Sequence, residues 1–247
     1  MKPKEHGAYA ILLIPMVTSF LSWGITTSGV CVALAAFAGF MAHEPLLVMI
    51  GNRGARAQRN APSAWERCSL LVVVALLLGS YALVQANGPA RIGLVACLLL
   101  AVVGFVIAVR GKHRTYAGQL LGVASLSAPS LAISLLAGAA WQTSVSTWCT
   151  WLLGFAATTS GVRSVIAAQK QKPRLVYLAA MVVLTTVAIL LLLPLKLSPL
   201  SCLPMVLAGW YLHLCPPPVR QIRRVGWTLV GVTLFTAILQ VLAVTRS

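Results

Sequence analysis

The sequence contains no aspartate, and its only acidic residues are Glu5, Glu44 and Glu66. Only 9% of the 247 residues are charged while 59% are hydrophobic, a balance far too apolar for an ordinary soluble domain. A magnesium site bridged by carboxylates needs several acids close together, which three scattered glutamates do not supply. The composition indicates a chain that lies in a lipid bilayer.

The usual motifs of cofactor and metal sites are absent as well. The six cysteines are scattered without a CxxC pair, so they are predicted to fill apolar segments rather than to form disulfides or bind zinc. No Walker loop, zinc-ligand spacing or nucleophile elbow occurs. We therefore predict neither a metal nor a cofactor.

Long apolar runs recur along the whole sequence. A helix needs roughly 20 apolar residues to cross about 30 Å of hydrocarbon. Runs of this kind predict an all-α protein, a polytopic bundle of about nine transmembrane helices in one membrane domain over residues 1–247. The predicted spans are about 8–25, 29–50, 68–86, 91–109, 116–140, 145–168, 175–195, 197–215 and 225–245.

The basic residues predict how these spans are oriented. The nineteen Lys and Arg residues give a net charge of +16. Sixteen of them lie in the N-terminal lead and the even-numbered connections, and only Arg91, Lys196 and Arg246 lie on the other side. Because basic loops stay in the cytoplasm, the N-terminus is predicted inside and the C-terminus outside a bacterial cytoplasmic (inner) membrane. Bases in such short loops are expected to meet anionic lipid headgroups rather than nucleic acid.

Proline and glycine predict local features of the bundle. Pro129 in the fifth span cannot donate a helical hydrogen bond, so we expect a kink there, with the hydroxyls of Ser125, Ser127 and Ser130 near the freed carbonyl. Pro204 is expected to disturb the eighth span in the same way. Six glycines are predicted to let helices pack closely: Gly7, Gly39, Gly118, Gly122, Gly154 and Gly161.

The most unusual polar pair within a predicted span is His43-Glu44. At about 1.5 Å per residue, Glu44 lies roughly 10 Å below the cytoplasmic end of its helix. A buried carboxylate without a cation tends to be protonated, so Glu44 is predicted to hold a proton or to pair with a base. The candidate partner is Arg163 in the sixth span. Glu44 and His43 are therefore candidate catalytic residues, with an ion pair that only fixes helix packing as the alternative.

Two polar stripes are predicted to reach the cytoplasmic surface together. They are Thr159, Arg163 and Lys170 on the sixth span, and Asn52, Arg56 and Asn60 after the second, with Arg53 beside the second stripe. If the two helices are neighbours, their ends form a basic pocket suited to phosphate, because a guanidinium group binds two phosphate oxygens at once. The alternative is that these bases serve only as orientation signals.

The lead before the first span combines a base, an acid and an imidazole. Lys4 is predicted to join the phosphate-binding residues, and Glu5 and His6 to join the candidate catalytic residues. Gly7 directly after them permits close approach of the backbone. An interfacial cap on the first helix is the alternative role of this segment.

The string Pro3-Lys4-Glu5-His6-Gly7-Ala8 resembles the opening of the YwiC-like family of bacterial membrane proteins. The His43-Glu44-Pro45 patch and the basic loop after it also resemble that family's second-span region. The resemblance implies an integral membrane protein of bacteria.

The two polar stripes also fall where UbiA-type prenyltransferases carry functional motifs, in the loops after the second and sixth helices. That resemblance implies a nine-helix scaffold with the N-terminus inside. The enzymes hold magnesium with Asp-rich motifs, whereas this chain has Asn52-Arg53-Gly54-Ala55-Arg56 and Arg163-Ser164-Val165-Ile166-Ala167 at these places. A transferase on this scaffold would be independent of metal.

Three functions follow as hypotheses. The first is a UbiA-like scaffold that binds a phosphorylated lipid or an isoprenoid (prenyl) lipid in its basic pocket, with or without chemistry. The second is a non-enzymatic accessory or assembly subunit whose apolar faces dock a membrane protein partner. The third is a small transporter with Glu44 as its proton site, for which a single intramembrane acid offers little.

Overall fold

The computed structural model describes residues 6–192, 199–218 and 221–245, and these residues form helices without any strand. The elements are α1 (His6–Trp23), α2 (Thr27–Met49), α3 (Ala55–Arg59), α4 (Ala64–Gln85), α5 (Gly88–Val109), η1 (Lys112–Arg114), α6 (Tyr116–Ser127), α7 (Pro129–Leu136), α8 (Trp141–Gln169), α9 (Leu175–Leu192), η2 (Pro199–Cys202), α10 (Leu203–Leu214) and α11 (Ile222–Thr245). The elements η1 and η2 are short 3-10 helices.

Within the described ranges, five stretches are long and apolar enough to cross a membrane. They are Thr27–Met49, Ala64–Gln85, Gly88–Val109, Tyr116–Leu136 and Arg224–Thr245. Three further helices are apolar but shorter: Gly7–Trp23, Leu175–Leu190 and Leu203–Leu214. The prediction of an α-helical membrane protein is confirmed at this level.

Helix covers at least part of each predicted apolar segment, and prolines account for the breaks. The fifth segment divides into α6 and α7, and α7 begins at Pro129, as predicted. The hydroxyl of Ser127 donates to the Val123 carbonyl at 2.8 Å, and that of Ser130 to the Ser127 carbonyl at 2.7 Å. Pro204 lies in the first turn of α10, where a missing amide hydrogen costs nothing, and the 3-10 helix η2 ends just before it, so the eighth segment is irregular at this proline. The predicted boundary near residue 196 lies outside the described residues.

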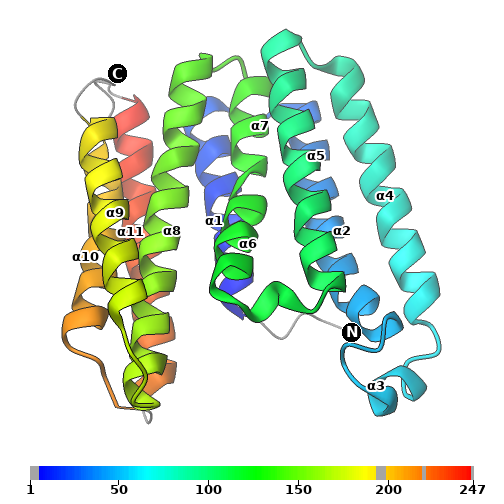
Figure 1. Cartoon of the computed structure of the whole chain (residues 1–247). Coiled ribbons are helices and arrows are strands. Elements are labelled where there is room, and N and C mark those ends of the chain that lie inside the picture. The colour runs from blue at the N-terminus through cyan, green and yellow to red at the C-terminus, as the bar shows by residue number, and fades with distance from the viewer. Residues whose placement is uncertain (1–5, 193–198, 219–220, 246–247) are drawn as a thin grey trace.

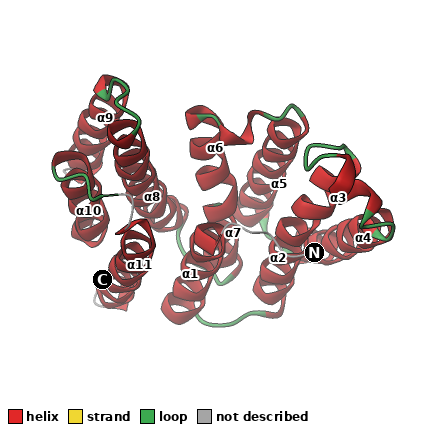
Figure 2. Cartoon of the chain, turned by 90° about the horizontal axis from the view of Figure 1, so that it is seen from below, coloured by secondary structure: helices red, strands yellow, loops and turns green. Residues whose placement is uncertain are grey.

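The long helices run roughly side by side, and successive ones point in opposite directions (Figure 1). Seen along the bundle, α8, α9, α10 and α11 form one group, and the helices from α1 to α7 form the other (Figure 2). Contacts of α1 with α11 and of α6 and α7 with α8 join the two groups. In the first group α8 packs closely on α10, and in the second α2 packs closely on α4.

Apolar side chains fill the space between the helices and also cover much of the outside. Leu12 and Met16 of α1 are buried against Ala132 and Ile133 of α7 in the larger group. Trp151 is fully buried on α8. By contrast, α4 and α5 expose many large apolar side chains, so only 11% of each span is buried. Such outward-facing apolar surface is expected where lipid surrounds a protein.

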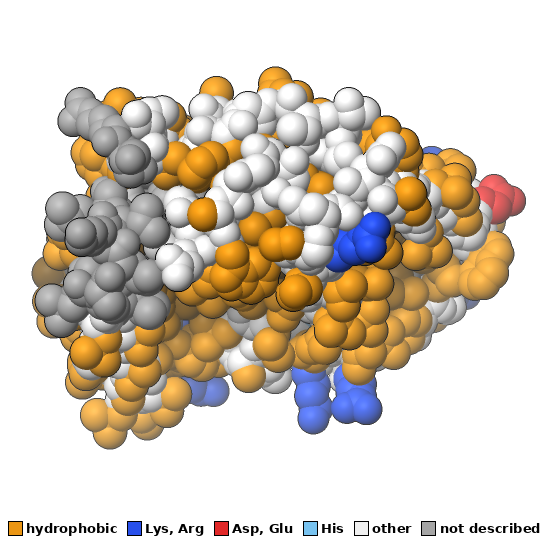
Figure 3. Space-filling model, turned by 90° about the horizontal axis from the view of Figure 1, so that it is seen from above, with side chains coloured by type: hydrophobic (Ala, Val, Ile, Leu, Met, Phe, Trp, Pro, Cys, Tyr) orange, Lys and Arg blue, Asp and Glu red, His pale blue; other side chains and the backbone are white. Residues whose placement is uncertain are grey.

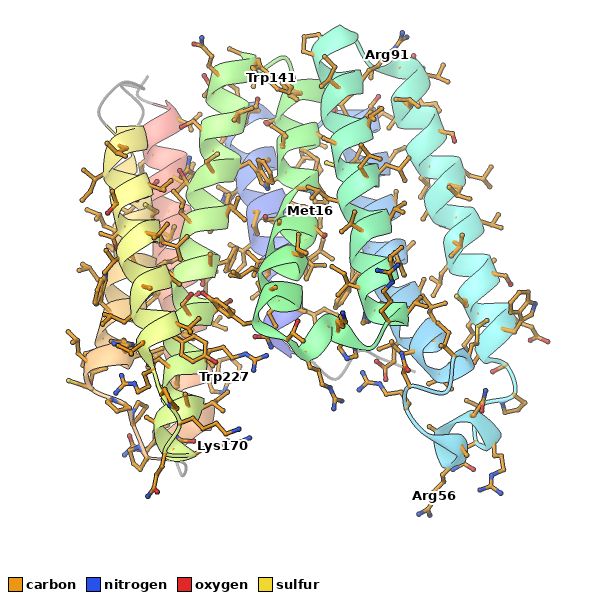
Figure 4. The ribbon with its side chains drawn as sticks, viewed as in Figure 1. Met16, Arg56, Arg91, Trp141, Lys170 and Trp227 are labelled. Carbon is orange, nitrogen blue, oxygen red and sulfur yellow. The ribbon has the colours of Figure 1, made fainter. Side chains whose placement is uncertain are left out.

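Charge is divided between the two ends of the bundle. Arg56 and Lys170 lie at the lower end, where α3 and the α8–α9 turn are found, and Arg91 lies at the upper end (Figure 4). The face seen from above is mostly apolar or uncharged, with Lys and Arg confined to a few small areas (Figure 3). We call the lower end of Figure 1, which carries α3, η1 and the turns after α8 and α10, the basic end.

The prediction that glycines allow close packing is confirmed between α8 and α10. A Cβ atom on Gly154 would lie 2.8 Å from the sulfur of Met205, and one on Gly161 would lie 2.7 Å from the carbonyl oxygen of Gly209. Gly118 instead lets α6 approach η1. The prediction is wrong for three positions, where nothing lies within 4 Å because the α-carbons face open space: Gly7, Gly39 and Gly122.

Candidate functional site

Glu44 is buried on α2 and forms an ion pair with Arg53. Arg53 Nη2 lies 2.6 Å from Glu44 Oε2, and the Glu44 side chain is only 7% exposed. The predicted pairing of Glu44 with Arg163 is therefore wrong. Arg53 replaces Arg163 because the chain turns back on itself directly after α2.

Two glycines make this reversal possible. Gly51 and Gly54 have φ angles of 81° and 88°, a conformation that residues with a side chain rarely adopt. The loop is also fastened to its neighbours, because the Asn52 amide donates to the Ala108 carbonyl at 3.1 Å and the Gln58 amide to the Met49 carbonyl at 2.9 Å. Asn52 thus satisfies the end of α5 rather than facing a ligand.

The single basic pocket predicted between the second and sixth spans is wrong. α2 packs on α4 and α7, whereas α8 packs on α10, α9, α6 and α7. Figure 2 shows α1, α6 and α7 lying between α2 and α8. The candidate residues consequently fall into two groups. We call them the α2 cluster (His43, Glu44, Arg53 and His113) and the α8 cluster (Tyr116, Gln119, Ser160, Arg163, Ser164, Arg174 and His213).

In the α2 cluster two imidazole rings face each other edge to face. The ring centroids of His43 and His113 are 6.2 Å apart with an interplanar angle of 84°. Both ring nitrogens of His113 are buried and make no hydrogen bond, and the same holds for Nε of Arg53. From the sequence alone His113 is an isolated residue at a span end, and the structure places it beside a predicted site residue instead.

The segment that carries His113 is held in place by its own backbone. Gly111 has a φ of 68°, and the Thr115 hydroxyl donates to the Lys112 carbonyl at 2.8 Å while accepting from the Gly118 amide at 3.1 Å. Thr115 is thus the N-cap of α6. This cap fixes the position of the next residue, Tyr116, which belongs to the α8 cluster.

In the α8 cluster Arg163 donates only to neutral groups. Its Nε lies 2.6 Å from Oε1 of Gln119, and its Nη2 donates to the Arg114 carbonyl. One turn earlier on α8, the Ser160 hydroxyl lies 2.6 Å from the Tyr116 hydroxyl. Two side-chain contacts, Arg163 with Gln119 and Ser160 with Tyr116, therefore join α8 to the beginning of α6.

Arg174, directly before α9, extends the same cluster. Its Nε donates to the Ser164 hydroxyl at 2.9 Å, and that hydroxyl lies 2.7 Å from Nδ1 of His213 on α10. Since a serine hydroxyl has one proton to give, this order of contacts suits a neutral imidazole that accepts at Nδ1. Arg174 Nη2 is buried and makes no hydrogen bond.

Of the α8 cluster, sequence reasoning selects only Arg163 as a site residue. It counts Arg174 among the orientation signals and gives no role to Ser164 or to His213, whose side chain is buried. The adjacency of Ser164 to Arg163 is the one available signal. Nothing in the sequence shows that α10 brings an imidazole against α8.

The other predicted site residues do not join either cluster. Arg56 is exposed on α3, Lys170 is exposed at the end of α8, and Thr159 is half-buried on α8. Lys4 and Glu5 lie outside the described residues, and His6 begins α1. Among the described residues no group of three or more His, Cys, Asp or Glu side chains could hold a metal ion.

Comparison with known proteins gives one match. The model of the YwiC-like protein family matches residues 3–134, which is more than half of the chain and runs from the N-terminal string into α7. The matched part includes the whole α2 cluster and the Tyr116 and Gln119 side of the α8 cluster. No curated protein and no solved structure matches the chain. The chain belongs to the YwiC-like protein family.

Proposed function

We propose that this chain is a nine-span protein of the bacterial cytoplasmic membrane that binds a phosphorylated or prenyl lipid at its basic end. The observation that carries the proposal is the excess of positive charge at that end. The Arg53–Glu44 contact is the one ion pair among the described residues. The other described cations at that end make no ion pair, so anionic headgroups are their natural counterions.

The proposed topology extends the five candidate spans to nine. α1, α9 and α10 are apolar but short, and α8 is long but rich in Ser and Thr. All four lie alongside the longer helices (Figure 1). With α1 entering and α11 leaving at opposite ends, the distribution of bases favours a cytoplasmic N-terminus.

An apolar cavity lies at the same end, in the other helix group from Arg163, so it suits an acyl chain of a surrounding lipid rather than the tail of the lipid that Arg163 holds. A cavity of 360 Å³ lies where α2 ends and α4 begins, and its lining includes Val48, Met49, Ala61 and Trp65. Because both helices are candidate spans, the cavity lies at the level where hydrocarbon meets headgroups. Trp65 is 67% exposed at its rim, as aromatic side chains at membrane interfaces often are.

Native mass spectrometry of the mildly purified protein tests the proposal. We expect one retained phosphorylated or prenyl lipid, which is lost from Arg163→Ala and kept by the control Arg91→Ala, whose substitution lies at the opposite end. A mixture of bulk lipids that is the same in both variants would contradict lipid recognition. Co-purification of a stoichiometric protein would then favour the accessory-subunit function, for which the exposed apolar faces of α4 and α5 offer a surface.

The transporter hypothesis has less support. Its proton site is Glu44, and that carboxylate is already engaged in an ion pair with Arg53. The resemblance to UbiA-type prenyltransferases stays a prediction, as does a chemical step at either cluster.

A further inference from the structure

We propose that the α8 cluster binds a phosphate monoester group, with Arg163 and Arg174 as its cationic ligands. The inference deepens the proposed function by naming the chemical group recognised and the residues that recognise it, and it rests on the proposed function for the membrane origin of the ligand. The same chemistry is offered by a lipid headgroup and by free phosphate.

The first argument is uncompensated charge. Arg163 and Arg174 are both half-buried, and their recorded partners are an amide oxygen, a backbone carbonyl and a hydroxyl. Of the two acids among the described residues, Glu44 is taken by Arg53 and Glu66 is exposed on α4, in the other helix group. Partly buried cations with neutral partners strongly favour the arrival of an anion.

The second argument is a surplus of hydrogen-bond donors. A guanidinium group carries five N–H donors and no acceptor. The hydrogen bonds of Arg163 use its Nε and Nη2 nitrogens, and that of Arg174 uses its Nε. Nη2 of Arg174 is buried without a hydrogen-bond partner. Leaving a buried charged donor unpaired is unfavourable, and an oxygen-rich ligand would supply the missing acceptor.

The third argument is the position of the helix ends. Two helices begin at the cluster. α6, of 12 residues, begins at Tyr116, and α9, of 18 residues, begins at Leu175, directly after Arg174. Thr115 caps the Gly118 amide at the start of α6, and the positive dipole ends of both helices favour an anion. α8 continues past the cluster toward the basic end (Figure 1), where it ends at Gln169.

The balance of charge selects the type of phosphate. A monoester carries about −1.5 to −2 charges and three terminal oxygens at neutral pH, which matches two guanidinium groups. A phosphodiester such as phosphatidylglycerol carries a single charge and offers fewer terminal oxygens. Arginine suits this task because its planar donors bind two oxygens at once.

Calorimetric titration of the full chain in detergent tests the inference. The probes are short-chain phosphatidic acid, short-chain phosphatidylglycerol and inorganic phosphate. We expect phosphatidic acid to bind the wild type more tightly than phosphatidylglycerol. Arg174→Gln should weaken its binding about tenfold or more, and Arg174→Lys by less, because the lysine keeps the charge without the paired donors. The matched control is Arg110→Gln, an exposed arginine at the same end, which should bind as the wild type does.

Each outcome has a defined meaning. Phosphate as tight as phosphatidic acid identifies a site for a free anion, and phosphatidic acid alone identifies a lipid headgroup site. Equal binding of the two lipids, or equal losses in Arg174→Gln and Arg110→Gln, overturns the inference. The wild-type comparison of lipids holds even when a variant fails to fold. A retained phosphodiester lipid that Arg163→Ala releases would leave the proposed function standing while the inference fails.

Discussion

Gly161 of α8 and Gly209 of α10 pack backbone against backbone. A Cβ atom on Gly161 would lie 2.7 Å from the Gly209 carbonyl oxygen, and one on Gly209 would lie 2.7 Å from the Ala157 carbonyl oxygen. This close approach sets the distance between Ser164, three residues after Gly161, and His213, four residues after Gly209. A hydrogen bond of 2.7 Å between their side chains is the result.

Gly209→Ala should therefore destabilise the bundle. The added methyl group has rigid backbone as its neighbour, so α8 and α10 must separate, at a cost of about 1–3 kcal/mol. The measurement is thermal unfolding in detergent. Gly231→Ala in α11, where nothing lies within 4 Å, is the control and should be neutral or slightly stabilising. Equal melting temperatures for the two variants would show that the helices do not meet at these glycines.

The Glu44–Arg53 ion pair gives the second prediction. Glu44→Gln leaves the largely buried Arg53 guanidinium without its counterion, and we expect a loss of about 3 kcal/mol in the free energy of unfolding. The double variant Glu44→Gln/Arg53→Met should recover part of that loss, because it removes the unpaired charge. Glu66→Gln, at an exposed acid, should stay within about 0.5 kcal/mol of the wild type. A double variant as unstable as the single one would argue against the pairing.

The sequence predicts where the helices lie along the chain better than it predicts which helices pack together, and the reason is physical. Segment length and apolar composition follow from the thickness of the bilayer, and Pro129 breaks its span by losing a hydrogen-bond donor. Which helices touch depends instead on small shape differences between apolar faces, such as the meeting of Gly161 and Gly209. The sequence pattern therefore selects Arg163 as a candidate but assigns it to the wrong helix pair.

The pairing of Glu44 escapes sequence reasoning for a more local reason. The prediction extends the helical periodicity of the second span past Gly51, although α2 ends at Met49. Gly51 and Gly54 reverse the chain there, and the reversal brings Arg53 back against α2. Arg174 escapes it because a base at the end of a predicted span is usually explained by topology. Only the contacts of Ser164 with both Arg174 and His213 distinguish this arginine from such a signal.

Gly118→Ala tests whether η1 supports the α8 cluster. The new Cβ atom would clash with the Lys112 carbonyl oxygen, so η1 must move and take the Arg114 carbonyl away from Arg163. We expect a lower melting temperature and weaker binding of phosphatidic acid. Gly122→Ala in the same helix meets no atom within 4 Å and should keep both properties. Full affinity in Gly118→Ala would mean that η1 does not position Arg163.

Cys215 offers a direct test of orientation. It is exposed just after α10, at the basic end, which the proposed topology places in the cytoplasm. A membrane-impermeant maleimide should therefore label Cys215 in inside-out vesicles and leave it unlabelled in intact cells. Gln85→Cys in a Cys215→Ser background places an exposed thiol at the last residue of α4, at the opposite end, and should show the reverse pattern. Labelling of both thiols from the same side would contradict the alternation of the spans. Labelling of Cys215 only from outside, with the thiol of Gln85→Cys labelled only from inside, would instead invert the orientation.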